Sequence, residues 1–282
     1  MRKGSIREWT EDEINWVREN YCNKNIPKEI FEEKLDMRWG YIISRVSKLK
    51  LGYRKHSLNE DYFSEMNTWK KWYFLGWLFT DGHVHKHKNN NSVSMELQEE
   101  DEYILKAFKK DIELVNDNCI TTRKGRKHNW KDTKIFSFSS KKVTQDLKKL
   151  GMVPTKSLIL EFPKNIPKEF ESAFLLGCFD GDGCIHIDQR GYGEFAFIGT
   201  FDMCENFQKV LIENCSVNKI KIQKRPGDKN TYHFKYGGIY NCLRIQDYLY
   251  KNAEIYLTRK REKFNKIKKA EKNENNKCGH RS

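Results

Sequence analysis

The sequence lacks the features that would place it in a membrane or around a structural metal. Its eight cysteines form no Cys-x-x-Cys pair, so the usual ligand spacing of a zinc site is absent. The longest apolar stretches, near residues 72–79 and 173–179, are far shorter than the roughly 20 residues of a membrane-spanning helix. We therefore expect a soluble intracellular protein of the cytoplasm or nucleoid, with reduced thiols and no membrane partner. A phage or organelle origin stays open.

Acidic residues are too few to balance the basic ones. Lysine and arginine total 53 against 39 aspartates and glutamates, which gives a formal net charge of +14. This excess favours a polyanionic partner, because neutralising phosphates releases the counterions condensed on a nucleic acid. A merely soluble basic protein would show the same excess, so the charge alone leaves both interpretations open.

No linker rich in proline, glycine or serine divides the chain, yet residues 1–56 have the pattern of a separate helical module. Thr10 and Glu13 form the signature of a capping box at the start of a first helix. A second helix is expected after Pro27, a residue suited to a first turn. A third, over about residues 38–50, would turn four apolar side chains inward: Ile42, Ile43, Val46 and Leu49.

The third helix of this module is basic on its outer side, where Arg45 and Lys48 lie. Three short helices with a basic third one resemble a helix-turn-helix of the Myb/SANT type. The resemblance implies a recognition helix in the major groove of DNA, with Arg45 and Lys48 among its contacts. An ordinary helical cap with a solvated basic face is the alternative.

The rest of the chain repeats. FLGWLFTDG at residues 74–82 recurs as LLGCFDGDG at residues 175–183, and the same patterns follow each copy: two strands, a helix, two strands and a helix. We predict an α+β fold with two pseudo-symmetric αββαββα repeats over residues 57–166 and 167–282. The small all-α domain of residues 1–56 precedes them, and the second repeat ends in a basic tail.

Each motif copy has the pattern of a helix that ends at an acidic residue followed by glycine. Small residues four positions apart line one face of each helix, Gly76 with Thr80 and Gly177 with Gly181, so two helix backbones could approach closely. Pairing along these faces would bring Asp81 and Asp182 side by side at two negative helix ends. Such carboxylates repel each other unless cations lie between them, and closely placed divalent metals promote phosphodiester hydrolysis. Mg²⁺ is the natural ion, because it takes oxygen ligands.

The two segments resemble the paired motifs of the LAGLIDADG homing endonucleases, in the monomeric form that carries both copies. In the second copy, Gly177, Asp180 and Asp182 match the residues that the motif has at these positions. The first copy differs, because Phe79 stands at the inner acidic position. The resemblance covers about residues 66–270. It implies a monomer whose β-saddle binds a long, non-palindromic duplex DNA target and whose double-strand cut leaves 3′ overhangs.

The resemblance also implies the residues of the catalytic site. Asp81 and Asp182 would share two or three Mg²⁺ ions, with Thr80 and Gly181 as further ligands. A polar residue near the end of the second strand of each half, Gln98 or Thr200, would lie close to the attacking water. A lysine after the last helix of each half, Lys156 or Lys260, would lie beside the scissile phosphate, where a cation offsets developing charge. Arg259 competes with Lys260 for this role.

The strands are expected to form the DNA surface, because a twisted antiparallel ribbon can enter the major groove. KIKIQKR alternates polar and apolar residues, as a strand with one packed face does. Basic side chains in the loop RKGRKHNWK suit phosphate contacts. The predicted DNA contacts in the two repeats are Ser92, Ser94, Glu96, Arg123, Lys124, Arg126, Lys127, His186, Asp188, Lys219, Lys221 and Gln223.

Other interpretations compete with the nuclease. A DNA-binding regulator or an RNA splicing maturase could use the same scaffold, although decayed copies should have lost the metal-binding carboxylates, and both are present. A protein-splicing element needs a nucleophilic first residue and a terminal His-Asn pair, which Met1 and the ending His280-Arg281-Ser282 do not supply. His83 and His85 follow Asp81 directly but lack the further ligands of a zinc site.

Overall fold

The computed structural model describes residues 7–23, 25–52, 57–85, 91–116, 118–125, 131–154, 156–227 and 230–267. The chain forms two compact units, one from Met1–Asn59 with Lys109–Asn118 and the other from Glu60–Phe108 with Cys119–Ser282. No helix of the described residues is long and apolar enough to cross a membrane. The seven cysteines among these residues are all free thiols.

The first unit contains the three predicted N-terminal helices, α1 (Glu11–Asn20), α2 (Lys28–Leu35) and α3 (Trp39–Lys48). The capping box is confirmed: the Glu13 amide donates to Thr10 Oγ1 at 3.3 Å, and the Thr10 amide donates to the Glu13 carboxylate at 2.9 Å. A small core holds the helices together, and its fully buried members are Val17, Phe31, Leu35 and Ile42. Ile43 was predicted to face inward, but it is 44% exposed, because Ile42 and Val46 already fill the packed face of α3.

The second unit contains the predicted repeat, except for Lys109–Asn118, the end of α5 and the segment after it, which belong to the first unit. Its first half runs α4 (Trp69–Thr80), β1 (Gly82–Val84), β2 (Ser92–Gln98), α5 (Glu102–Asp111), β3 (Ile120–Arg123), β4 (Thr133–Ser139) and α6 (Lys141–Lys149). Its second half runs α7 (Glu171–Asp182), β5 (Gly183–Ile187), β6 (Gly193–Gly199), α8 (Phe201–Cys215), β7 (Gln223–Lys224), β8 (Tyr232–Gly237) and α9 (Ile239–Tyr250). Short 3₁₀ turns occur at Glu99–Asp101, Lys156–Leu158 and Lys168–Phe170. The element order αββαββα is therefore confirmed in both halves.

Each half forms a four-stranded antiparallel sheet of the same topology, β1-β2-β4-β3 in the first and β5-β6-β8-β7 in the second. The register is also repeated, because the glycine that ends each motif pairs with an equivalent partner: Gly82 opposite Met95 and Gly183 opposite Phe197. One strand is shorter than predicted. The alternating segment from residue 219 pairs with β8 only at Gln223 and Lys224.

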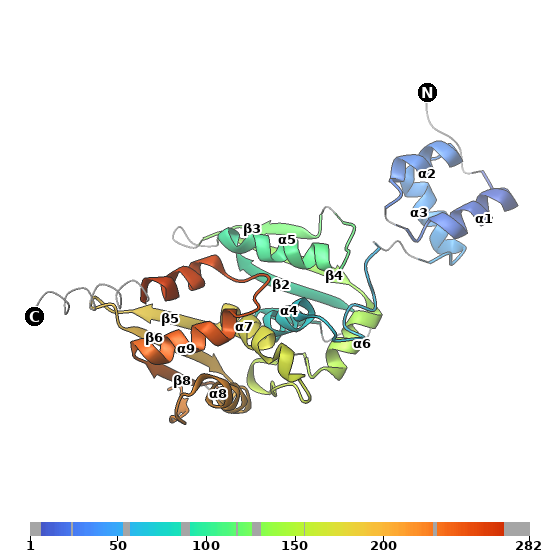
Figure 1. Ribbon diagram of the computed structural model, residues 1–282. Coiled ribbons are helices and arrows are strands. Elements are labelled where there is room, and N and C mark those ends of the chain that lie inside the picture. The colour runs from blue at the N-terminus through green and yellow to red at the C-terminus, as the bar shows by residue number, and fades with distance from the viewer. Residues whose placement is uncertain are drawn as a thin grey trace, which may run out of the picture. The chain divides into compact units, whose positions relative to one another are not determined.

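The motif helices α4 and α7 lie side by side at the centre of this unit, with the sheet of β1–β4 on one side and the sheet of β5–β8 on the other (Figure 1). Both helices are mostly apolar, as is typical of helices buried within a protein. Residues 72–79 of α4 and 172–180 of α7 are buried without interruption. The two halves therefore share one interior, and the C-terminal ends of the two helices are placed between the sheets.

A buried carboxylate fixes helix α6 against the segment that precedes α4. Asp146 is 3% exposed, and it accepts hydrogen bonds from Ser64 Oγ at 2.8 Å, Lys142 Nζ at 2.6 Å and Lys149 Nζ at 2.9 Å. Burial raises the pKa of Asp146, but these hydrogen bonds outweigh burial and lower the pKa to about 2. The folded state therefore favours the ionised carboxylate.

The Asp146 carboxylate is expected to stabilise the fold at neutral pH but not in acid. Its folded pKa lies below the unfolded value of about 3.9, so its contribution is complete above pH 4 and is lost as the pH falls towards 2. Asp146→Asn should lower the free energy of unfolding by roughly 1–3 kcal/mol at pH 7. Urea unfolding of both proteins at pH 7 and pH 3 checks this. A difference of the same size at both pH values would contradict it.

Candidate functional site

Glycines allow the backbones of α4 and α7 to touch, as predicted. A Cβ atom at Gly76 would lie 2.8 Å from the Cys178 amide nitrogen and still closer to the Phe174 carbonyl oxygen. A Cβ atom at Gly177 would overlap the Tyr73 carbonyl oxygen and lie 3.1 Å from Gly76 Cα. Real Cβ atoms do not approach backbone this closely, so any larger residue at either position would force the helices apart. This contact fixes where the two helices end.

The two motif carboxylates converge at these ends. Asp81 is the C-terminal capping residue of α4, and its amide donates to the Trp77 carbonyl at 2.9 Å. Asp182 is the last residue of α7. Asp81 Oδ2 lies beside Gly181, 2.8 Å from the place that a Cβ atom would take there. The absence of a side chain at Gly181 therefore leaves room for the carboxylate of the other half.

Both carboxylates reach solvent, but protein surrounds them on their other sides. Burial, followed by the charge of Asp182, raises the pKa of Asp81 to about 6. Burial also raises the pKa of Asp182, against the lowering effect of Lys156 and Lys260. The protein thus holds two like charges near each other in partly desolvated positions, which a cation between them would stabilise.

A buried lysine from each half completes each helix end. Lys156 is 8% exposed, and its Nζ donates to the carbonyls of Phe79, at 2.6 Å, and Thr80. Lys260 is 6% exposed, and its Nζ donates to four carbonyl oxygens at 2.6–3.3 Å, those of Phe179, Asp180, Gly181 and Gly183. The lysines therefore bind the C-terminal carbonyls of the motif helices, where a positive charge opposes the helix dipole.

The structure separates Lys260 from its sequence neighbour Arg259. The Arg259 guanidinium is bound through Nε and a terminal nitrogen to the carboxylate of Asp101, at 2.9–3.2 Å. Lys260 alone of the two reaches the end of α7. Burial, the largest effect, lowers the pKa of both Lys156 and Lys260 to about 8. The charges of Asp182 and Asp81 partly oppose this effect at Lys156. At Lys260, the charges of Asp180 and Asp81 oppose it.

Gln98 and Thr200 occupy equivalent positions, because each lies three residues after the strand residue that pairs with the motif glycine. Gln98 is exposed at the end of β2. Thr200 is 4% exposed and caps α8: its Oγ1 accepts from the Met203 amide at 3.2 Å and donates to the Leu160 carbonyl at 2.6 Å. The Thr200 hydroxyl is therefore engaged within the protein, whereas the Gln98 amide faces solvent.

A cavity of about 260 Å³ adjoins the carboxylate of Asp182. The predicted site residues Thr80, Lys156, Asp182 and Thr200 all line it. The remaining lining residues come from α4, the segment after Lys156, β6, α8 and the position before β8: Phe79, Leu160, Phe197, Ile198, Gly199, Met203 and Thr231. The structure thus brings residues of both halves around one space. Thr231 was not predicted, because it lies in no motif and is far in the sequence from the other residues that line the cavity.

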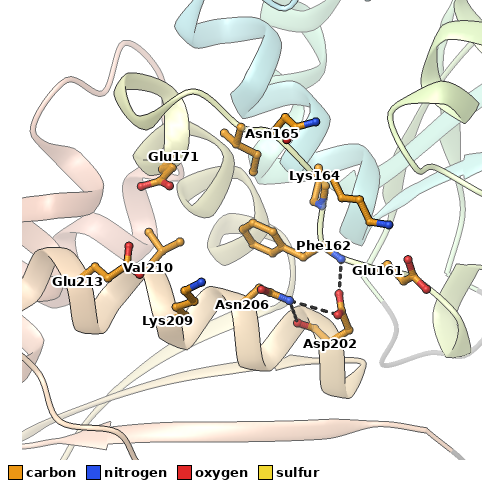
Figure 2. A pocket seen from close by; sticks show the side chains of 12 residues that line it. Glu161, Phe162, Lys164, Asn165, Glu171, Asp202, Asn206, Lys209, Val210 and Glu213 are labelled. Atoms are coloured by element: carbon orange, nitrogen blue, oxygen red, sulfur yellow. Dashed lines mark hydrogen bonds between the residues drawn. The ribbon is translucent and has the colours of Figure 1, made fainter.

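Another hollow, of about 490 Å³, lies between residues 161–166 and α8 (Figure 2). There the Phe162 amide donates to Asp202 at 2.6 Å, and Asn206 Nδ2 also donates to Asp202, at 3.2 Å. None of the predicted site residues lines this hollow. Its hydrogen bonds hold the segment that connects the two halves against α8.

The predicted contact face of β2 alternates as expected. Ser92, Ser94 and Glu96 are partly exposed, and the residues between them are buried. Glu96 accepts from Arg123 at 2.6 Å and from Thr133 Oγ1 at 2.6 Å, so two of the predicted DNA contacts are paired with each other on the open face of the sheet. Lys124 likewise pairs with Asp132, at 2.5 Å. Arg126 and Lys127 lie outside the described residues.

The predicted contact residues of the second half are also accessible. His186 is exposed on β5, and Lys219, Lys221 and Gln223 are exposed before and at the start of β7. Asp188 instead organises the turn between β5 and β6. Its carboxylate accepts from the amides of Arg190 and Tyr192, at 2.9 Å each, and from the Arg190 guanidinium at 3.1 Å.

In the N-terminal unit, the two predicted contact residues differ in exposure. Lys48 is exposed at the end of α3. Arg45 is half-buried, and its guanidinium lies 3.8 Å from the carboxylate of Glu8. The outer face of α3 therefore presents Lys48, together with Tyr41 and Ile43, which are 48% and 44% exposed.

Comparison with known proteins supports the fold. The sequence matches no protein-family model and no curated protein. Among solved structures, the chain is similar to the LAGLIDADG meganuclease I-CpaMI bound to uncleaved DNA, with 10% identity, 73% of this chain and 92% of that chain covered, and a TM-score of 0.51. It is also similar to meganuclease I-SmaMI bound to uncleavable DNA, with 13% identity, 72% and 90% coverage, and a TM-score of 0.50. The second unit therefore has the fold of LAGLIDADG endonucleases, as the two motifs predicted.

Proposed function

We propose that this protein is a site-specific endonuclease that hydrolyses one phosphodiester in each strand of duplex DNA, with Mg²⁺ as the metal. The observation that carries the proposal is the paired site at the ends of α4 and α7. There Asp81 and Asp182 converge, and a buried lysine of each half binds the adjoining helix end. The DNA-bound meganucleases of the same fold support this function.

The oxygen donors of the site fit a hard divalent cation. The described residues contain no group of three or more His, Cys, Asp and Glu side chains that could hold a metal ion, so the site would rely on two carboxylates and backbone carbonyls. Asp81 and Asp182 would hold Mg²⁺, two or three ions in all, and the carbonyls of Thr80 and Gly181 would add further oxygens. Mg²⁺ held by these oxygens would supply activation of the attacking water and stabilisation of the leaving oxygen.

The chain's own residues would supply position and charge. Lys156 and Lys260 bring a cation to each helix end, next to the carboxylates, where a scissile phosphate gains negative charge during hydrolysis. Because Thr80 and Gly181 already accept hydrogen bonds from these lysines, each lysine orients a carbonyl of the site. In the first half, the exposed Gln98 amide would orient the attacking water. In the second half, the Thr200 hydroxyl would orient it, although this hydroxyl already caps α8.

The DNA would lie across the open faces of the two sheets. Exposed polar residues of β2, β5 and the segment before β7 would contact base edges or phosphates, as predicted for Ser92, Ser94, His186, Lys219 and Gln223. Glu96 and Arg123 would have to exchange their mutual ion pair for DNA contacts. Lys48 and Arg45 of the helical module would add separate DNA contacts, as in a helix-turn-helix.

Cleavage of a randomised duplex library in Mg²⁺, with sequencing of both cut ends, tests the proposed function. Because the two halves differ and each would cut one strand, the protein should act as a monomer on a long, non-palindromic target. The cut should leave 3′ overhangs. Blunt ends, 5′ overhangs or a perfectly palindromic target would contradict this division between the halves. Selective binding without any cut would instead favour a regulator.

Residues 57–282 alone are expected to retain cleavage but to bind DNA more weakly than the full chain. The helical module would add phosphate contacts rather than chemistry, so its loss should flatten the dependence of affinity on salt, with each lost contact lowering the slope by about 0.9. Gel-shift titrations at several salt concentrations measure both quantities, and circular dichroism confirms folding. A folded but inactive truncation, or an unchanged affinity and slope, would contradict this role.

A further inference from the structure

The segment that carries Lys260 is held by a buried carboxylate of the second motif. Asp180 is 1% exposed, and its Oδ2 accepts from the Leu257 amide at 2.9 Å and from Tyr73 Oη at 2.8 Å. Leu257 lies three residues before Lys260, and Tyr73 belongs to α4. One carboxylate oxygen thus joins α7, α4 and the segment that delivers the lysine.

The first half holds the same segment from its other side. Tyr103 Oη donates to the Tyr256 carbonyl at 3.0 Å and accepts from the Thr258 amide at 2.9 Å. The buried carboxylate of Asp101 binds Arg259 through two guanidinium nitrogens. These contacts limit the conformational freedom of residues 256–260. The Lys260 ammonium is therefore held in one position, where it reaches four carbonyls at the end of α7.

Among the described residues of the first half, no carboxylate at the equivalent motif position makes the contact that Asp180 makes. Phe79 stands at the equivalent motif position, and its ring packs against Phe174, with ring centroids 5.4 Å apart. A phenyl ring accepts no amide hydrogen bond of this kind, and Lys156 reaches two carbonyls where Lys260 reaches four. The two lysines are thus positioned by different means, although their halves share a fold.

We propose that Asp180 is a positioning residue for Lys260, and hence for the cleavage of only one of the two DNA strands. A buried carboxylate is costly to desolvate, so the burial of Asp180 beside Tyr73 and Leu257 is weak evidence for a role in stability alone. Holding a cation in one place relative to a reacting phosphate is a role of another kind, since a misplacement of about 1 Å can slow a reaction about 100-fold. The inference rests on the proposed function, because it assigns one half of the site to each strand.

Strand-specific rates test the proposal. With each strand of a target duplex labelled separately, Asp180→Leu should slow one strand by about 10- to 100-fold and leave the other close to wild type, so that nicked DNA accumulates. Lys260→Met should slow the same strand. The double variant should be no slower than Lys260→Met alone, because both changes remove one function. Asp180→Asn keeps an acceptor for the Leu257 amide and should restore most of the lost rate.

Matched controls separate positioning from general damage. Val143→Ala removes buried volume from α6 and should slow neither strand selectively. Equal slowing of both strands by Asp180→Leu, additive effects in the double variant, or an Asn variant as slow as the Leu variant would each overturn the proposal.

A second measurement needs neither metal nor DNA. Amine labelling followed by mass spectrometry should show Lys260 becoming several-fold more reactive in Asp180→Leu, while Lys156 in the same molecule stays protected. Unchanged Lys260 reactivity would overturn the proposal. If the wild type cuts no DNA, the proposed function fails, and the labelling result alone decides whether Asp180 positions Lys260.

Discussion

Replacing Asp81 or Asp182 by asparagine is expected to abolish double-strand cleavage while leaving DNA binding in Ca²⁺ nearly unchanged. Asparagine has the shape of aspartate but no charge, so each variant would keep the helix ends and lose the anionic ligand for Mg²⁺. The neutral amide also relieves the repulsion that contributes to the raised pKa of Asp81, so stability should not fall. A loss of about 1000-fold or more in rate is expected.

Cleavage in Mg²⁺ and gel-shift affinity in Ca²⁺, measured side by side, check this. Asp12→Asn is a suitable control, because Asp12 is an exposed carboxylate in the first turn of α1 and should affect neither measurement. If either motif variant cut at the wild-type rate, the carboxylate that it lacks would not be part of the catalytic site. Lost binding in Ca²⁺ would show that the aspartates contribute to DNA affinity as well as to chemistry.

Local patterns in the sequence were sufficient to predict most of the fold. The repeated motif marks two helices of equal length, and strict alternation in SVSMELQ matches the bounds of β2, since side chains on a strand alternate between two faces. The segment KIKIQKR alternates equally well, yet only two of its residues pair with β8. Alternation shows that a segment could pair along its length, but the partner strand decides how far it does.

Contacts between residues far apart in the sequence could not be predicted in the same way. Lys260 and Arg259 are neighbouring cations, and nothing in their local sequence distinguishes them. Asp101, in the first half, binds Arg259 and leaves Lys260 to reach the end of α7. The hydrogen bonds of Asp180 to Leu257 and Tyr73 depend on the fold in the same way. The motif showed that a carboxylate stands at this position, and only the tertiary structure shows what it holds.

Inserting a side chain between the motif helices should damage the protein more than any change on the sheets. Gly177→Val would place carbon atoms on the Tyr73 carbonyl and against the backbone at Gly76 and Trp77. Backbone atoms of two packed helices cannot rotate away as a side chain can, so the helices must separate. Overpacking of a core costs about 1–3 kcal/mol where side chains can yield, and this contact should exceed that range.

The melting temperature of Gly177→Val should therefore fall by about 8 °C or more, since 1 kcal/mol corresponds to about 2–4 °C in a protein of this size. Cleavage should be lost even in the fraction that stays folded, because separated helices no longer bring Asp81 and Asp182 together. Gly237→Ala is the matched control: a Cβ atom there meets nothing within 4 Å, so both stability and cleavage should be kept. Thermal melts and cleavage assays of the two variants decide the matter. A Gly177→Val protein with the melting temperature and activity of the wild type would mean that the close approach of α4 and α7 does not hold the site together.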